Sequence, residues 1–223
     1  MISVTENPLK KKPAMDDLTL YGSSSGKIDS SFFARIVKTQ QKKSYTSILE
    51  ELLYKRSEFG NGDPIKHQRL VERDALKRFE EFFGDYPLRD CGLFIDPESY
   101  FLCANPTKLY GNEDIVNVKC PLKQYGKTFD KAIREIPFWK KVNGSWELNK
   151  QHEWFIELQG DLHITGRNYG NLMVWLGEKL GEAQFRIVRI PRDDAFFRDK
   201  MKPKLDYFYE NVMVKELVYK FVT

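Results

Sequence analysis

Cysteine, histidine and long apolar stretches are all scarce in this chain of 223 residues. The three cysteines, Cys91, Cys103 and Cys120, form no CxxC pair and have no histidine at a metal-binding spacing, so we expect free thiols and no zinc site. No run of about 18 apolar residues is present, so we predict no membrane span. The first residues, MISVTENPLKKKP, also lack the apolar centre of a signal peptide. We therefore expect an intracellular protein.

A strong excess of either charge is missing too. There are 36 lysines and arginines against 32 acidic residues, which gives a net charge of +4. This mild excess permits nucleic-acid binding without requiring it. Residues 1–26 are polar and include Lys10-Lys11-Lys12, so we expect a flexible arm followed by one domain over residues 27–223. The lysine triplet is a candidate nuclear-import or phosphate-contact patch, which favours the nucleus over the cytoplasm, although it also fits a solvated tail.

Short strand-like runs alternate with longer amphipathic segments along the rest of the chain. Turn signals at Asp96-Pro97 and Asn105-Pro106 close two of the apolar runs. This alternation predicts an α/β or α+β class. The predicted strands are 92–95, 100–104, 115–119, 172–176 and 185–190, and the predicted helices are 27–38, 44–54, 65–83, 148–165 and one or two within 195–222.

Two stretches of the chain resemble a known family. The stretch from Gly92 to Pro121 and the stretch from Leu148 to Arg167 resemble the YqaJ-type viral recombinases, relatives of phage lambda exonuclease in the PD-(D/E)XK nuclease superfamily. The resemblance implies a PD-(D/E)XK restriction-endonuclease-like core, with a central mixed β-sheet flanked by helices. The matching residues are Gly92-Leu93, Asp96-Pro97, Ala104, Pro106, Asp114, Val118-Lys119-Cys120-Pro121, His152, Leu158-Gln159-Gly160, Leu162 and Ile164-Thr165-Gly166-Arg167.

Two positions that matter for the chemistry depart from the family. The family has an aspartate where this chain has Thr107 and a glutamate where it has Asn117, whereas the lysine is kept as Lys119. In the family the two carboxylates hold Mg²⁺, a hard ion that prefers charged oxygen ligands. Thr and Asn offer neutral oxygens, which offset the dehydration of the ion poorly. We therefore expect no bound metal, no cofactor and no catalysis at this place.

The resemblance also assigns the other residues of the site. It places Glu72 and Gln159 with Thr107, Asn117 and Lys119 in one degenerate active-site pocket, with Glu72 on the inward stripe of its helix. It implies DNA contacts near the start of the first helix, where either Ser30 or Ser31 is a plausible N-cap. The implied nucleic-acid-binding residues are Lys27, Ser31, Arg35, Lys119 and Arg167.

Three functional hypotheses follow. The first is a pseudoenzyme, a nuclease fold that binds DNA without cutting it. The second is a protein-interaction module in which the DNA groove has been reused; we expect a protein partner and regard DNA as a possible one. The third is an active Mg²⁺-dependent exonuclease whose carboxylates have moved, and the candidate ligands are Glu72, Asp96, Glu113, Asp114 and Glu157.

Overall fold

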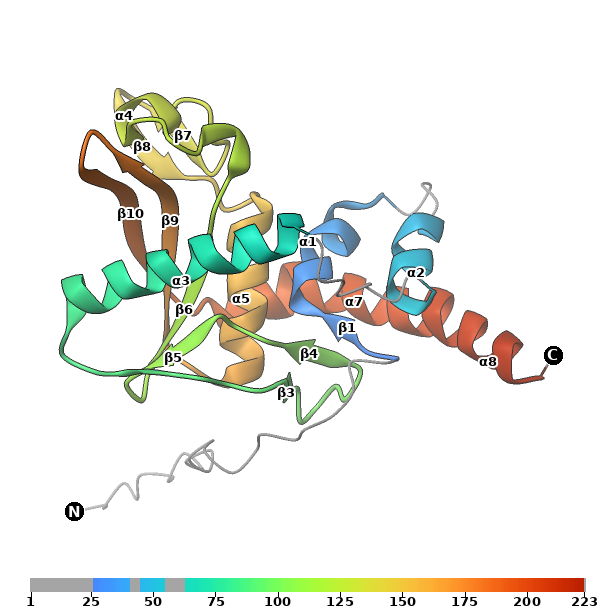
Figure 1. Cartoon of the computed structure of the whole chain (residues 1–223). Helices are drawn as coiled ribbons and strands as arrows, with labels where there is room; N and C mark the ends of the chain where they lie inside the picture. The colour runs from blue at the N-terminus through green and yellow to red at the C-terminus, as the bar shows by residue number, and fades with distance from the viewer. Residues whose placement is uncertain (1–25, 41–44, 55–62, 223) are drawn as a thin grey trace, which may run out of the picture.

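The computed structural model describes residues 26–40, 45–54 and 63–222. Nearly all of the predicted N-terminal arm, including Lys10-Lys11-Lys12, lies outside these ranges. The described residues form a five-stranded sheet, a three-stranded sheet and a two-stranded hairpin, with helices around them (Figure 1). The predicted class, a central mixed β-sheet flanked by helices, is confirmed.

The five-stranded sheet is the centre of the fold. Its strands lie in the order β10–β9–β6–β5–β2, and β6 and β9 run parallel while the other neighbours are antiparallel. Lys119 at the end of β6 pairs with Val174 of β9. The strands are β2 (Leu88–Arg89), β5 (Lys108–Tyr110), β6 (Asp114–Lys119), β9 (Tyr169–Lys179) and β10 (Glu182–Pro191). The sequence predicted three of these strands and missed the short β2 and β5.

A second, smaller sheet supports the first helix. Strand β4 (Leu102–Ala104) lies between β3 (Phe94–Ile95), which is antiparallel to it, and β1 (Ile28–Asp29), which is parallel. Because β1 leads directly into α1 (Ser30–Lys38), this sheet fixes where α1 begins.

Helix α3 (Asp63–Phe83) covers one face of the five-stranded sheet. Residues four apart on a helix share a face, and Val71, Ala75 and Phe79 form a stripe that packs against the sheet. Their partners on β6 and β9 are Val116, Met173 and Trp175.

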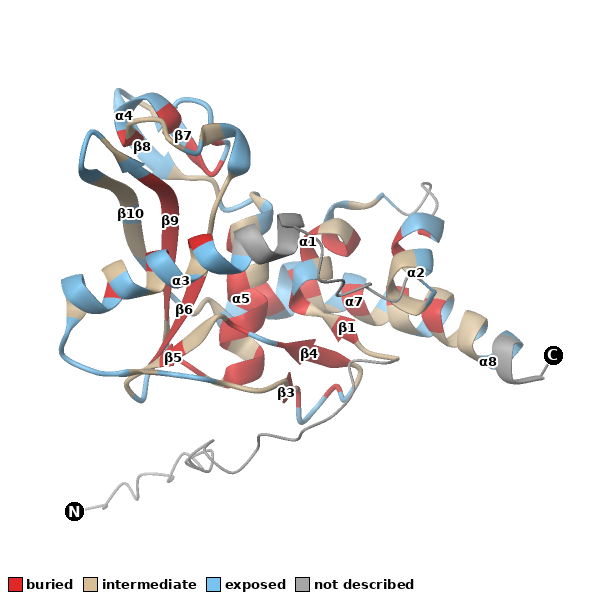
Figure 2. Ribbon diagram, in the orientation of Figure 1, coloured by how far each residue is buried: buried red, intermediate tan, exposed pale blue. Residues whose placement is uncertain are grey.

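Helix α5 (Glu153–Thr165) covers the opposite face and is much more deeply buried than α3 (Figure 2). Leu158 and Leu162 belong to the main hydrophobic core together with Ile115 and Leu172 of the sheet. Helix α1 crosses α5 at Gly160, where an added Cβ would lie 2.5 Å from the Phe33 ring. This close approach brings Ser30, at the start of α1, beside Asp161 of α5.

The remaining elements lie at two ends of the molecule (Figure 1). A continuous helical run ends the described chain: α6 (Asp194–Phe196), η3 (Phe197–Met201), α7 (Lys202–Phe208), η4 (Tyr209–Met213) and α8 (Val214–Val222), with α2 (Thr46–Leu53) nearby. Between β6 and α5 the chain forms η2 (Leu122–Gln124), α4 (Phe129–Ala132), β7 (Trp139–Val142) and β8 (Ser145–Leu148). No helix among the described residues is long and apolar enough to cross a membrane.

Candidate functional site

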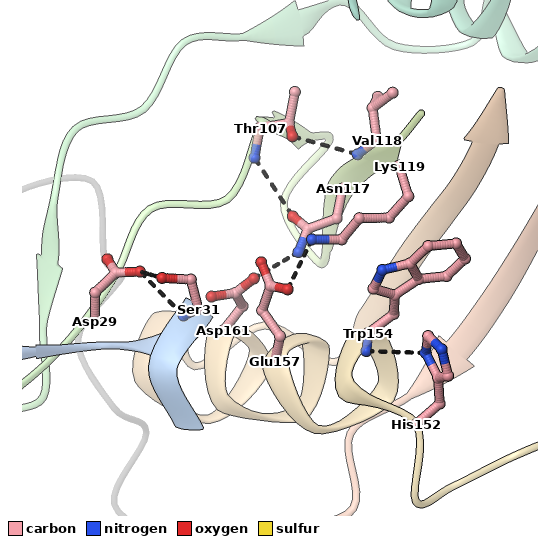
Figure 3. A network of polar contacts seen from close by, with 10 residues as sticks. All are labelled: Asp29, Ser31, Thr107, Asn117, Val118, Lys119, His152, Trp154, Glu157 and Asp161. Carbon is pink, nitrogen blue, oxygen red and sulfur yellow. Dashed lines mark hydrogen bonds and ion pairs between the residues drawn. The ribbon is translucent and has the colours of Figure 1, made fainter. Parts of the chain in front are cut away.

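Thr107 and Asn117 lie next to each other on the β5–β6 hairpin, as the sequence predicted. Lys108 pairs with Val116, which sets Thr107 opposite Asn117. The Thr107 backbone N–H donates to Asn117 Oδ1 at 3.4 Å, and the Val118 N–H donates to Thr107 Oγ1 at 3.3 Å (Figure 3). Each of the two side chains that replace the family's carboxylates therefore accepts a hydrogen bond from a backbone N–H of the hairpin.

Two carboxylates approach this hairpin from helix α5. Glu157 and Asp161 are four residues apart and so share one face of the helix. Asn117 Nδ2 donates to Asp161 Oδ2 at 2.6 Å, and Lys119 Nζ lies 2.7 Å from Glu157 Oε2 (Figure 3). Asn117 and Lys119 alternate along one face of β6, so strand and helix meet through two matched polar contacts.

Asp161 is the most unusual group of this cluster. It is 1% exposed, and its Oδ1 atom has no hydrogen-bond partner among the described residues. Burial, together with the nearby negative charge of Glu157, raises the pKa of Asp161 to about 7, although Ser30 and Asn117 act in the opposite direction. The protonated form of Asp161 is therefore well populated near neutral pH.

Gln159 does not take part in these contacts. Its Nε2 donates to the Pro191 carbonyl at 3.0 Å, and its Oε1 accepts from the Asp193 N–H at 2.8 Å. A step of two residues turns the side chain by about 200° around a helix, so Gln159 and Glu157 point in nearly opposite directions. The sequence predicted Gln159 as a residue of the pocket and named Glu157 only as one candidate for a relocated ligand. In the structure it is Glu157 that contacts Lys119. The signal it missed was the Glu157–Asp161 spacing on a largely apolar helix.

Glu72 reaches the end of β6 from the other side of the sheet. Its helix, α3, packs on the face opposite to α5, and among the described residues Glu72 makes none of the contacts that join Asn117 and Lys119 to α5. That Glu72 shares a pocket with them stays a prediction. Its charge instead adds to burial in raising the pKa of the Cys120 thiol, to about 12. Glu72 was predicted to lie on the inward-facing apolar stripe of its helix. The apolar residues of that stripe, Leu76, Phe79 and Phe83, do pack on the sheet, whereas Glu72 itself is only half-buried.

The start of α1 differs in detail from the prediction. The N-cap is Asp29 and neither Ser30 nor Ser31; Asp29 Oδ1 accepts from the Ser31 N–H at 3.0 Å and from Ser31 Oγ at 2.6 Å (Figure 3). A carboxylate is a favourable N-cap because it also faces the positive end of the helix dipole. It occupies the position where the sequence placed a phosphate contact. Lys27, two residues earlier, is half-buried.

Arg35 and Arg167 do not share a surface with Lys119. Arg35 forms an ion pair with Glu51 of α2 at 2.6 Å. Arg167 is 7% exposed and donates to the Gly111 carbonyl at 2.8 Å, in the turn that precedes β6. Lys119 lies at the other end of that strand, about 17 Å from its first residue at 3.3–3.4 Å per residue. Arg167 therefore stabilises a turn away from the polar cluster.

The other carboxylates proposed as relocated ligands are engaged elsewhere. Asp114 lies 2.8 and 3.0 Å from the Arg189 guanidinium and also accepts from Asn171. Asp96 accepts from the backbone N–H groups of Glu98 and Ser99 and lies 3.3 Å from His163; these hydrogen bonds outweigh burial and lower its pKa. Glu113 accepts from Asn168. In the described part of the chain, no group of three or more acidic, histidine or cysteine side chains is arranged to hold a metal ion.

An aromatic wall flanks Lys119 at the start of α5. His152 is the N-cap of this helix, and its Nδ1 accepts from the Trp154 N–H at 3.3 Å (Figure 3). Burial lowers the pKa of His152, and the positive charges of Lys38 and Lys119 lower it further. Trp154 is partly buried, and its ring packs against those of His152 and Phe138. Cationic and aromatic side chains thus meet at this end of β6.

Comparisons with known proteins give structural matches alone: no family model matches the chain, and no curated protein matches its sequence. The alkaline exonuclease LHK-Exo from Laribacter hongkongensis superposes with a TM-score of 0.64 at 20% identity, over 88% of this chain and 92% of that one. The fold is that of the phage-type exonucleases. LHK-Exo in complex with dAMP gives a TM-score of 0.67 at 19% identity and the same coverage.

A third structure agrees with these two. A phage-related exonuclease from Haemophilus somnus 129PT has a TM-score of 0.56 at 13% identity, over 85% of this chain and 96% of that one. The resemblance predicted from the sequence is confirmed at the level of the fold. The residues that meet at Lys119 differ from those that the family resemblance implies, so the chemistry of this place depends on the side chains present here.

Proposed function

We propose that this chain binds DNA through the region around Lys119 and does not cut it. The observation that carries the proposal is that two neutral side chains, Thr107 and Asn117, stand where the family resemblance predicts two metal-binding carboxylates, and each already accepts a backbone N–H. Magnesium in nucleases lowers the pKa of a bound water and polarises the phosphate. A hydroxyl and an amide that already hydrogen-bond within the hairpin do not fit that role.

DNA binding needs less than DNA cleavage. Phosphate contacts require cationic groups and hydrogen-bond donors, and stacking requires exposed aromatic faces. Lys119, which is ion-paired with Glu157, and Lys38 both lie near enough to His152 to lower its pKa, so two cationic donors gather at the start of α5. The exonuclease neighbours support DNA as the ligand class. A protein partner and a nuclear location stay predictions from the sequence.

A second candidate function is favoured by one observation. Glu157 and Asp161 place two carboxylates beside Lys119, and Asp161 Oδ1 is buried without a hydrogen-bond partner among the described residues. If this chain is instead a metal-dependent exonuclease with relocated ligands, these two residues would hold the Mg²⁺. Against it, Lys119 already neutralises Glu157, and the raised pKa of Asp161 disfavours the charged form that a metal needs.

The proposal is tested by DNA binding of Lys119→Ala, measured by fluorescence anisotropy on labelled linear duplex in EDTA. Losing one charge-assisted contact should weaken binding about tenfold and reduce the salt dependence by about one phosphate contact. Arg198→Ala is the matched control, because it removes one positive charge from an exposed residue that is ion-paired to Asp199. Equal affinity of parent and Lys119→Ala, with both melting normally, would overturn the proposal.

A further inference from the structure

The positive charge of the chain is concentrated in one segment. Residues 121–150 contain seven lysines and arginines and three acidic residues, a net charge of +4, which equals the net charge of the whole chain. The other residues are therefore balanced. This segment forms η2, α4, β7 and β8 at one end of the molecule, next to the upper ends of β9 and β10 in Figure 1. A local excess of lysine and arginine is one of the electrostatic features expected of a nucleic-acid interface.

The same segment encloses a cavity of about 580 Å³ against strand β10. This volume lies within the range of about 300–1,000 Å³ that is usual for small-molecule sites. Its walls combine aromatic, cationic and acidic side chains. The lining includes Asp130, Arg134, Trp139, Trp146, Leu148 and Arg186.

The hairpin β7–β8 presents one of its faces to the cavity. Trp139 pairs with Leu148, and Trp146 precedes Leu148 by two residues, so the three side chains share a face. Asn143 and Gly144 both have positive φ, +48° and +85°, as a two-residue hairpin turn requires, and this turn fixes the register. Trp139 is 7% exposed, whereas Trp146 is 39% exposed and leaves much of its ring accessible.

The cavity is separate from the polar cluster at Lys119 but lies on the same side of the sheet. Lys119 pairs with Val174, and Val174 pairs with Arg186, so the three lie in one row across β6, β9 and β10. At about 4.8 Å between strands, the backbones of Lys119 and Arg186 are about 10 Å apart. Val174 between them is fully buried, and the Arg186 guanidinium lies 5.0 Å from the Phe129 ring of α4.

We infer that this cavity binds one unpaired nucleotide of single-stranded DNA. Trp146 offers a face on which a base stacks, and Arg134 and Arg186 supply guanidinium groups for the adjoining phosphate. The Asp130 carboxylate is placed to accept a hydrogen bond from an amino group of the base. The inference rests on the proposed function, since it gives the bound DNA a second contact about two strands away from Lys119. The excess positive charge of the segment fits any polyanion, and the accessible ring of Trp146 favours DNA over an acidic peptide, because every base has a face that stacks.

Trp146→Ala tests the inference, with anisotropy of a labelled single-stranded oligonucleotide and of a blunt duplex measured in EDTA. Loss of one stacked base should weaken single-strand binding about tenfold and leave blunt-duplex binding within about twofold of the parent. Arg134→Ala should weaken single-strand binding and lower its salt dependence by about one phosphate contact. Tyr100→Ala is the control, because Tyr100 is 74% exposed and does not line the cavity.

The outcomes separate this inference from the proposed function. If Trp146→Ala and Arg134→Ala bind the single strand as the parent does while Lys119→Ala binds duplex weakly, the cavity inference is wrong and the proposed function stands. If Trp146→Ala loses single-strand binding while Lys119→Ala binds duplex normally, the reverse holds. If polyglutamate of the same charge displaces the labelled single strand as well as unlabelled single-stranded DNA does, the inference is also wrong, because the cavity would then recognise negative charge and not a base.

Discussion

The β5–β6 hairpin and helix α5 face each other across the same polar cluster. The family resemblance implies acidic side chains on the hairpin and a neutral one on the helix, whereas here the hairpin is neutral and the helix is acidic. The hairpin carries Thr107 and Asn117, where the family has carboxylates, while the helix carries Glu157, where the family has glutamine. With Asp161, the helix brings two acidic groups to the strand that keeps Lys119. Negative charge has thus left the hairpin and is found on the helix, and Lys119 remains neutralised.

Restoring the hairpin carboxylates should give the largest effect. In Thr107→Asp with Asn117→Glu, the new side chains would meet Asp161 and lose the Asn117 Nδ2 donor, so the melting temperature should fall without metal. Mg²⁺ or Mn²⁺ at about a hundred times its dissociation constant should recover about 2.7 kcal/mol, or roughly 5–10 °C in a protein of this size. Thermal denaturation with and without metal measures both changes.

The neutral double variant Thr107→Asn with Asn117→Gln is the matched control, because it has the same shapes without the charges. It should show the small metal response of the parent. If the charged and neutral variants respond alike across a millimolar range of metal, the two hairpin positions do not act as a pair.

Asp161 should give a smaller effect that depends on pH. Its folded-state pKa, about 7, lies above the ordinary value of 3.8, so the folded state binds this proton more tightly than the unfolded state does. Its contribution to stability is therefore present at low pH and is lost as the pH rises through about 7. The melting temperature of Asp161→Asn minus that of the parent should therefore be several degrees larger at pH 8 than at pH 5. A difference independent of pH would contradict the assignment of a buried, proton-binding Asp161.

Periodicity and turn signals were enough to predict the class of this fold and most of its longer elements, whereas the layers followed from the family resemblance. The stripe that includes Phe79 predicted how α3 packs, and the Val- and Ile-rich run at Ile115 predicted β6. The three-residue strand β5 was missed because so short a run has no clear alternation. The N-cap of α1 was assigned one residue late or more, because Asp29, Ser30 and Ser31 are all good capping residues and only the backbone decides between them.

The candidate site was predicted less completely than the fold. The register of the β5–β6 hairpin brings Thr107 and Asn117 together, and the family resemblance predicted this although strand β5 itself was missed. Which face of α5 meets β6 was not predictable from Gln159 alone, because α5 is buried nearly all round and has no clear polar side. Tertiary contacts from β10 and α6 hold Gln159, and these involve residues more than thirty positions away.

Whether the protein binds DNA without cutting it is tested most directly on one purified sample. Linear duplex DNA would be incubated with the protein in molar excess, with binding followed by anisotropy and cleavage by gel, in EDTA, Mg²⁺ and Mn²⁺. The account predicts binding in all three conditions and no metal-dependent cleavage in any. Cleavage in Mg²⁺ or Mn²⁺ that disappears in Glu157→Gln and in Asp161→Asn would contradict it and establish a nuclease whose ligands come from helix α5.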